Sequence, residues 1–382
     1  MKVNTFGEDF MKGRAAIYHG PDQPFELREF PLPEVEPDAI LVRISMAGVC
    51  GSDLHIWRGE LPGRFHAVAG HEMMGRVAEL GGNIRTDTQG QPLSVGDRIA
   101  YAYFYPCRRC YVCLRGDLAA CPNQMPITAA GSPPYFTGAF ADYYYLRPGH
   151  YVYKVPDELS DELVAPVNCA LSQVIYGLHR AGLRFGDSVV MQGAGGLGLN
   201  AAAVAREMGA RQVIAIDGIR GRLELARAFG ATDTLDINEI NTSEQRIALI
   251  RELTNGVGAD IVCDFVGLAS VIPEGIEMLR NGGSYLEVGN ISTGATTQLT
   301  PSRLVFTSKR IVGVYHYDPW VIPTALDFLV RNRGRYPFDQ VVSHQYPLEE
   351  IDRAHAEAEW LNRSDNPTAV TRAVVTPGGT WS

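Results

Sequence analysis

The sequence contains no long hydrophobic run, since no segment approaches the ~18 consecutive apolar residues that a membrane-spanning helix needs. It also has no apolar stretch behind a basic N-terminal start, which is the pattern of a secretory signal peptide. These absences argue against a membrane span and against secretion. We therefore expect a cytoplasmic protein with no membrane partner.

Concentrated positive charge is absent too. The formal net charge is -9 at pH 7, and the sequence holds no block of basic residues. Because nucleic acid binding usually requires a basic patch, we expect no nucleic acid partner. The chain also shows no internal repeat and no low-complexity segment. This composition is typical of an ordinary soluble enzyme.

The cysteine content does not suit a disulfide framework, because the seven cysteines are an odd number. Four of them lie between residues 107 and 121, whereas the other three are far apart. This crowding is more typical of a metal site in a reducing compartment than of a secreted, disulfide-linked domain.

The 382 residues are 46% hydrophobic and 20% charged, which is enough for a large core and two lobes. Residues 1 to 155 contain short strand-like runs, such as 39–50 and 95–105, which predict a β-rich domain. Beyond residue 160, strands and helices alternate, which predicts a doubly wound parallel sheet and an α/β fold class. We predict domains at residues 1–172, 173–316 and 317–382, the last returning to the first lobe.

A glycine-rich turn lies directly between a predicted buried strand and a predicted helix, and its glycines are Gly193, Gly195, Gly196 and Gly198. Such a turn lets backbone N–H groups and the helix N-terminus approach a pyrophosphate. Asp217 ends the next strand, where a carboxylate accepts bonds from the adenosine ribose and repels the 2′-phosphate of NADP. This favours NAD, although Arg220 and Arg222 can accommodate a phosphate. The alternative is a plain strand-to-helix turn.

The crowded cysteines Cys107, Cys110, Cys113 and Cys121 have the spacing CxxCxxCx7C. Four thiolates from one loop can hold a tetrahedral zinc ion in a closed structural site. An iron–sulfur cluster is the rival interpretation, but the spacing of the fourth cysteine is unusual for one. Four thiols without a metal are the remaining alternative.

A catalytic zinc needs three protein ligands and one open position. Cys50 lies in a segment that also holds Ser52, Asp53 and His55, and His71 is followed by Glu72. Cys169 lies near the boundary of the predicted nucleotide-binding lobe. Cys50, His71 and Cys169 are therefore candidate ligands, and the alternative is that they are ordinary buried residues.

These motifs resemble, in their order along the whole chain, the zinc-dependent medium-chain alcohol dehydrogenase family. The matching segments are Cys50-Gly51-Ser52-Asp53-x-His55, Gly70-His71-Glu72, Gly96-Asp97-Arg98, the four-cysteine loop, and the glycine turn with Asp217. The resemblance implies a GroES-like catalytic domain split around a Rossmann domain. It also implies two zinc ions per chain and a homodimer or homotetramer formed through the Rossmann domains.

The resemblance also implies roles for single residues. Cys50, His71 and Cys169 match the catalytic zinc ligands, and Glu72 matches a carboxylate that can act as an alternating fourth ligand. Ser52 and His55 match the proton relay from the substrate to solvent. Asp53 matches the carboxylate that orients the zinc-bound histidine.

Two departures from the family pattern bear on substrate and cofactor. The polyol branch of the family has a glutamate at the position of Cys169, so this cysteine favours a simple alcohol without excluding a polyol. Gly51 stands where some members have an arginine that contacts the pyrophosphate, and Arg372 is a loosely aligned candidate for that contact.

We expect a neutral, fairly hydrophobic primary or secondary alcohol as the substrate, because no basic cluster is available for an acidic one. Aromatic residues that can line the pocket are Trp57, Tyr101, Tyr103, Phe104, Tyr105, Tyr135, Phe136 and Phe140, although aromatic residues on strands more often fill the core. The alternatives are a polyol dehydrogenase, a zinc-free double-bond reductase that uses NADPH, and a non-catalytic protein that binds dinucleotide and metal.

Overall fold

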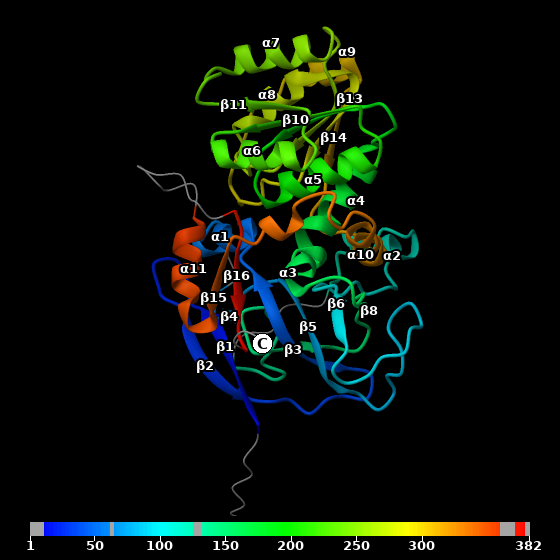
Figure 1. Ribbon diagram of the computed structural model, residues 1–382, viewed down its shortest axis with the longest axis vertical. Helices are drawn as coiled ribbons and strands as arrows, with labels where there is room; N and C mark the ends of the chain where they lie inside the picture. The colour runs from blue at the N-terminus through cyan, green and yellow to red at the C-terminus, as the bar shows by residue number, and fades with distance from the viewer. Residues whose placement is uncertain (1–10, 62–64, 125–130, 360–370, 379–382) are drawn as a thin grey trace, which may run out of the picture.

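The computed structural model describes residues 11–61, 65–124, 131–359 and 371–378. Figure 1 shows two lobes, a β-rich lobe below and a lobe with a parallel sheet above, with helix α4 (Ser172–Ala181) at their junction. Among the described residues, no helix is long and apolar enough to cross a bilayer. The predicted α/β fold class is confirmed.

The upper lobe holds a six-stranded sheet in which every neighbouring pair is parallel. Its strands, in spatial order, are β11 (Asp233–Asp236), β10 (Gln212–Asp217), β9 (Ser188–Gln192), β12 (Ala259–Asp264), β13 (Leu279–Glu287) and β14 (Arg310–Gly313). The order reverses between β9 and β12, and doubly wound sheets bind their ligands at such a switch point.

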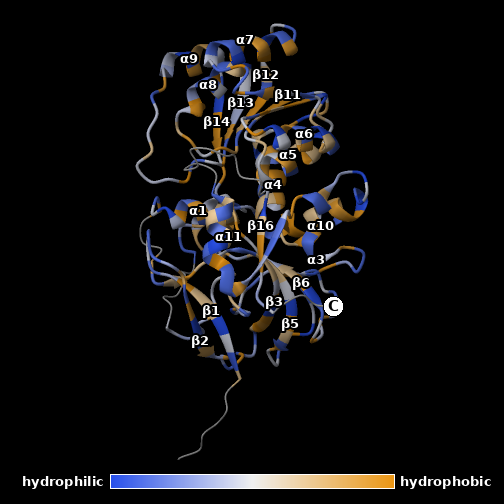
Figure 2. Cartoon of the chain, turned by 60° about the vertical axis from the view of Figure 1, so that its left-hand side comes forward, coloured by the Kyte–Doolittle hydropathy of each residue, from blue (hydrophilic) through white to orange (hydrophobic). Residues whose placement is uncertain are grey.

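Helices cover both faces of this sheet (Figure 1), so its central strands β9 and β12 are largely buried, whereas the edge strand β14 is mostly exposed. Along β9, Val189 and Met191 belong to one hydrophobic cluster and Val190 to another. Figure 2 shows mostly orange strands in this sheet, whereas α7 (Ser243–Leu253) mixes hydrophilic and hydrophobic residues. The other helices of this lobe are α5 (Gly196–Glu207), α6 (Arg220–Ala228), α8 (Val271–Met278) and α9 (Pro301–Thr307).

The lower lobe contains a three-stranded and a seven-stranded sheet around its own core. The smaller sheet has the order β2 (Glu26–Pro31), β1 (Lys12–Tyr18) and β4 (Ala67–Val68). The larger has the order β15 (His344–Pro347), β16 (Ala373–Thr376), β3 (Ile40–Gly48), β5 (Glu72–Leu80), β6 (Arg98–Tyr101) and β8 (Val152–Lys154), with β7 (Tyr143–Leu146) also paired to β3.

The strand-like run near the C-terminal end forms β16, which lies between β15 and β3. The segment after residue 317 also supplies α10 (Val321–Arg331), which packs on α4, and α11 (Ile351–Ala358), which packs beside α1 (Gly51–Trp57). The short elements α2 (Tyr111–Leu114), η1 (Leu118–Ala120), α3 (Asp161–Val164), η2 (Val167–Leu171), η3 (Phe338–Gln340) and η4 (Leu348–Glu350) complete the described structure. The exact domain boundaries stay a prediction.

Candidate functional site

The three candidate zinc ligands meet at the junction of the lobes. Cys50 is the N-cap residue of α1, His71 directly precedes β5, and Cys169 lies in η2, a short π-helical turn. The two Sγ atoms are 3.7 Å apart, and Cys169 Sγ is 3.4 Å from His71 Nε2. The three ligand atoms all lie within 4.8 Å of one another. Two thiols and one imidazole are a donor set that suits zinc and leaves a position open, so the residues fit a catalytic zinc.

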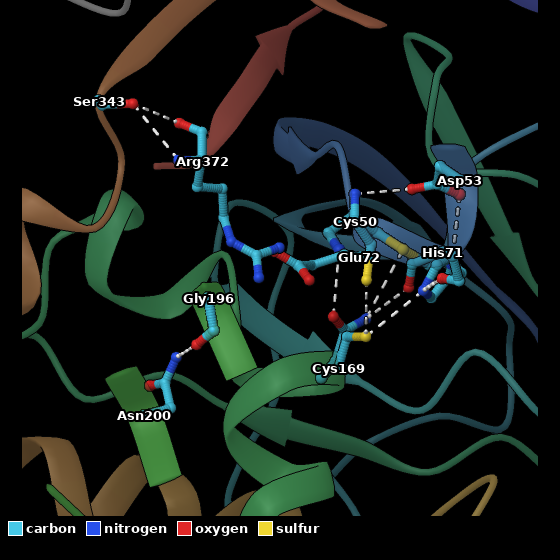
Figure 3. A network of polar contacts seen from close by, with 12 residues as sticks. Cys50, Asp53, His71, Glu72, Cys169, Gly196, Asn200, Ser343 and Arg372 are labelled. Atoms are coloured by element: carbon cyan, nitrogen blue, oxygen red, sulfur yellow. Dashed lines mark hydrogen bonds and ion pairs between the residues drawn. The ribbon is translucent and has the colours of Figure 1, made fainter. Parts of the chain in front are cut away.

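Asp53 fixes the orientation of His71 (Figure 3). Its Oδ1 lies 3.2 Å from His71 Nδ1, and its Oδ2 accepts the Cys50 N–H at 2.9 Å. Burial lowers the pKa of His71, whereas the Asp53 carboxylate raises it by more than this. The pKa of His71 therefore lies above its ordinary value. With Nδ1 directed at Asp53, Nε2 is left toward the two cysteines. The hydrogen bond from Cys169 lowers the pKa of Cys50 and favours its thiolate.

Asn168 holds the π-helical turn that carries Cys169, a role that the sequence analysis missed. Its side chain is fully buried, and its Oδ1 accepts the Met73 N–H at 3.1 Å. Its Nδ2 donates to the Tyr101 carbonyl at 3.1 Å. These bonds fasten η2 to the start of β5 and to β6. The available signal was a polar amide within the otherwise apolar stretch around Cys169.

Glu72 and Arg372 form a buried ion pair next to the candidate ligands (Figure 3). Arg372 Nη1 donates to Glu72 Oε1, and both side chains are less than 5% exposed. Burial raises the pKa of Glu72 to about 7, and the Arg372 charge opposes this shift. The guanidinium of Arg372 also lies against Gly196, where a Cβ atom would clash with it. Because the guanidinium of Arg372 adjoins the glycine turn, its position is compatible with the predicted contact with a pyrophosphate.

At the end of β10, Asp217 supports the glycine turn. Its Oδ2 accepts the Ala194 N–H at 2.7 Å, and its Oδ1 accepts the Ile219 N–H at 2.9 Å. Arg222 lines the same cavity as Asp217, and burial lowers the pKa of its guanidinium. Arg220 is exposed and pairs with Glu224 on α6. Of the two arginines, Arg222 is the one that faces the cavity.

One cavity of about 1310 Å³ joins the candidate zinc ligands to the glycine turn. The predicted site residues that line it are Cys50, Ser52, Asp53, His55, His71, Cys169, Gly193, Gly195, Gly196, Asp217, Arg222 and Arg372. Glu72 and Gly198 lie behind this wall, and a Cβ atom on Gly198 would clash with the Gly193 carbonyl. The candidate zinc ligands and the glycine turn thus share one cavity.

The aromatic wall differs from the prediction. Tyr103 and Phe104 line the cavity, and the Tyr103 ring lies 5.0 Å from the His71 ring. The prediction was wrong for Trp57, which packs beside His355 in the β-rich lobe. Tyr101 and Tyr105 are buried in the β-rich lobe, as the core-filling alternative expects. The candidates Tyr135, Phe136 and Phe140 also lie in or against that lobe and do not line the cavity. Lining residues that the sequence analysis missed include Leu61, Phe65, Gln124, Thr137, Tyr144, Ile291, Tyr315 and His316.

The predicted relay residues Ser52 and His55 both lie on α1, three positions apart and therefore on one face of the helix. Ser52 Oγ is 3.2 Å from His71 Nε2, so the hydroxyl adjoins the candidate zinc ligands. His55 is 5% exposed, and its Nδ1 is turned toward Glu60 and Ser292.

The four crowded cysteines form a second cluster outside the cavity. Their ligand atoms all lie within 4.8 Å of one another. Cys110 Sγ is 3.9 Å from Cys121 Sγ, which accepts the Cys107 N–H at 3.3 Å. A hydrogen bond from the backbone at Arg109 is the main reason that the pKa of Cys107 falls to about 6. Four converging sulfur atoms, none lining the cavity, fit a structural zinc site.

Two family models match the chain: residues 36–157 match an alcohol dehydrogenase GroES-like domain, and residues 196–331 match a zinc-binding dehydrogenase domain. The chain is 34% identical to 5-exo-hydroxycamphor dehydrogenase of Pseudomonas putida over 86% of this chain and 91% of that one. It is 30% identical to erythritol/L-threitol dehydrogenase of Mycolicibacterium smegmatis over 90% and 93% of the two chains.

Solved structures agree with these matches. An alcohol dehydrogenase from Thermotoga maritima has a TM-score of 0.85 and 29% identity, and the match covers 96% of this chain and 100% of that one. Benzyl alcohol dehydrogenase from Acinetobacter calcoaceticus has a TM-score of 0.82 and 26% identity, with the same coverage. The chain belongs to the zinc-containing medium-chain alcohol dehydrogenase family and is an oxidoreductase that acts on alcohol groups.

Proposed function

We propose that this enzyme oxidises a neutral, fairly hydrophobic primary or secondary alcohol and transfers the hydride to NAD. The observation that carries the proposal is the single cavity that joins Cys50, His71 and Cys169 to the glycine turn and Asp217. This cavity would give an alcohol and a dinucleotide access to the same space.

Cys50, His71 and Cys169 would hold a zinc ion in this proposal. When bound, zinc would supply Lewis acidity at the substrate hydroxyl, and NAD would be the hydride acceptor. Ser52 lies beside His71 Nε2 and takes the hydroxyl proton. His55, on the same face of α1, receives that proton on its way to solvent. Asp53 keeps the His71 ring in place throughout.

The finer cofactor assignments are part of the same proposal. Asp217, on the cavity wall, supports NAD over NADP because its charge repels a 2′-phosphate. The four-cysteine cluster supports a second, structural zinc ion. We also propose a homodimer or homotetramer. In the described structure β14 is an edge strand of the parallel sheet, and Phe306 on the neighbouring α9 is 84% exposed.

The wall of the cavity supports a hydrophobic substrate, since Leu61, Phe65, Tyr103 and Ile291 contribute to it. A polyol substrate is the second candidate. Gln124, Thr137 and His316 place polar side chains on the same wall, and a 30% identical relative is named for erythritol and L-threitol. The named activity of another relative, on 5-exo-hydroxycamphor, supports the hydrophobic alternative.

A substrate screen separates the two candidates. NAD reduction is measured with ethanol, cyclohexanol, benzyl alcohol, a bicyclic terpene alcohol, erythritol and sorbitol. We assume that a ring buries roughly 100 Å² more apolar surface than ethanol and that burial stabilises the transition state by about 25 cal/mol per Å². The cyclic alcohol should then have a kcat/KM roughly 70-fold above that of ethanol. A preference for erythritol or sorbitol would establish the polyol candidate instead. Absence of NAD reduction with every alcohol would contradict both.

A further inference from the structure

A carboxylate is placed directly behind the relay histidine. His55 Nδ1 lies 2.5 Å from Glu60 Oε2 and 3.0 Å from Ser292 Oγ. The His55 side chain is 6% exposed, whereas Glu60 is 31% exposed, so Glu60 lies between the buried ring and water. No motif in the sequence marks Glu60, because it is five residues from His55 and far from Ser292.

Glu60 is held as an ionised acceptor. Its Oε1 accepts Arg58 Nε at 2.6 Å, and Arg58 Nη1 donates to Glu359 at 2.8 Å. Burial raises the pKa of Glu60, but hydrogen bonds from Arg58, Ser292 and His55 outweigh it and lower the pKa to about 2. Glu60 therefore carries its charge at any working pH.

The position of Glu60 determines which nitrogen of His55 is free. A neutral imidazole has one donor and one acceptor nitrogen, and a carboxylate only accepts. Nδ1 must then carry the proton that faces Glu60, and Nε2 is left as the acceptor. Nε2 lies close to Gly267, 3.1 Å from the position that a Cβ atom on this glycine would take. The sequence neighbours of Gly267, Val266 and Leu268, line the cavity. The free nitrogen thus lies at the cavity wall.

We propose that Glu60 is the positioning residue of the proton relay, fixing His55 with Nδ1 protonated and balancing the charge of the imidazolium. Nε2 receives the relayed proton, the Nδ1 proton leaves to water at the exposed edge of Glu60, and exchange with water restores the starting tautomer. Arg58 Nη2 lies 3.1 Å from Nδ1 and can only donate, so it competes for this nitrogen as an acceptor. The Glu60 contact with Nδ1 is shorter, at 2.5 Å, and Arg58 is also paired with Glu60 and Glu359, so we assign the Nδ1 proton to the contact with Glu60. This inference rests on the proposed function.

The second lobe takes part in holding Glu60. Ser292, which follows β13, donates to Glu60 Oε2 at 2.5 Å. The Thr293 N–H donates to the Glu60 carbonyl at 3.2 Å. The carboxylate behind His55 is therefore oriented by groups from both lobes, and the relay is complete only when these two segments meet.

The first test needs no turnover. Histidine is labelled with ¹⁵N, and the His55 signals are assigned by their loss in the His55→Gln variant. We expect the Nδ1–H tautomer in the native protein and its loss in Glu60→Gln. A native Nε2–H tautomer, or a tautomer unchanged in Glu60→Gln, would overturn the proposal. Ser292→Ala, which removes one donor to Glu60, should partly weaken the Nδ1–H signal if Glu60→Gln does not fold.

The second test uses kinetics with benzyl alcohol and NAD. Glu60→Gln should lower kcat by roughly 10-fold to 100-fold, part of the ~10² to 10⁴ that general acid–base catalysis contributes, with KM for NAD nearly unchanged. The same change in a His55→Gln background should have little effect, because the two residues act as a unit. Additive losses would contradict a role through His55.

The chain offers a matched control. Glu26 also bridges a histidine and an arginine, with Oε2 2.7 Å from His19 Nε2 and Oε1 3.0 Å from Arg28 Nε, but it lies on the surface. Glu26→Gln should leave kcat unchanged. If the native protein oxidises no alcohol, the proposed function fails while the tautomer measurement still decides the role of Glu60.

Discussion

Arg372 donates to the buried carboxylate of Glu72, its partner 300 positions away in sequence, while the same guanidinium lies against Gly196 of the glycine turn. The ion pair is almost fully buried, and yet Arg372 Nε has no hydrogen-bond partner in the described structure. An anion at the turn would meet that guanidinium directly. The arginine therefore connects the candidate zinc site with the cofactor end of the cavity.

The two halves of this ion pair should differ in their effect on stability. Glu72→Gln leaves a buried guanidinium that cannot lose its charge, a change that typically costs about 3–5 kcal/mol. Arg372→Met leaves a carboxyl group that can take up a proton, so its cost should be smaller. Thermal unfolding of both variants measures the difference in Tm. Equal losses of Tm in the two variants would contradict the cost assigned to an uncompensated buried cation. Arg372→Met should also raise KM for NAD.

Zinc analysis should find two ions per chain. Cys169→Ala should lose one ion and nearly all activity, because it removes a ligand at the cavity. Cys113→Ala should lose the other ion and lower Tm. Cys263→Ala is the matched control, since Cys263 is buried but belongs to neither cluster. This variant should retain both ions. A native protein with a single zinc ion would remove one of the two sites.

The cofactor preference should depend on Asp217. Asp217→Gly should shift the ratio of kcat/KM for NAD to that for NADP toward NADP by at least about tenfold, by removing charge repulsion. Activity with NAD should also fall, because the bonds to Ala194 and Ile219 are lost. Arg222→Gln in the same background should cancel the gain with NADP. A native enzyme that already prefers NADP would contradict the role assigned to Asp217.

Stability should depend on pH through Glu287. Burial, and then the neighbouring Asp264, raise the pKa of Glu287 from 4.5 to about 8. Because the folded-state pKa is the higher one, the stabilising contribution is complete below pH 4.5 and is lost as the pH rises to about 8. Allowing for solvent screening of this partly buried group, roughly 1–3 kcal/mol is involved.

Comparison of Tm values for the native protein and Glu287→Gln between pH 5 and 8.5 measures this effect. The variant cannot ionise at this position, so its Tm relative to the native protein should rise by a few degrees across the range. Glu34→Gln, at an exposed glutamate, should follow the native curve. Parallel curves for Glu287→Gln would show that the carboxyl ionises freely in the folded protein.

The nucleotide-binding lobe was predictable because its signals are local. The strand that contains Val189 to Met191 is a short apolar run, the helix after Gly196 follows at once, and Asp217 ends the next strand. The candidate zinc ligands were identified from the motifs of the family resemblance, because their meeting in space could not be derived from spacing alone. The local sequence does not specify the pairing of β16 with β3. Only the expectation that the last segment returns to the first lobe indicated where β16 would lie.

The substrate wall was less predictable, and Trp57 shows why. A helix turns by about 100° per residue, so Trp57, two positions after His55, points to a different side of α1. Proximity in sequence was the wrong guide there. Ser292 and His316 were missed for the opposite reason, since only the folded arrangement of distant segments brings them to the relay and the cavity. Glu60 is close to His55 in sequence and was missed because no motif marks it.

The position of β16 has a consequence for how the protein is made. β16 pairs with β3, and its first residue, Ala373, accepts the N–H of Val49, the residue before Cys50. A ribosome releases β3 and Cys50 long before it translates residues 371–376. Until then the end of β3 at Ala47 and Gly48 lacks its β16 partner and Glu72 is without Arg372, while the parallel sheet can already fold. During synthesis, the lobe that begins first should therefore be completed last, and its open edge is where a chaperone or an aggregating neighbour would attach.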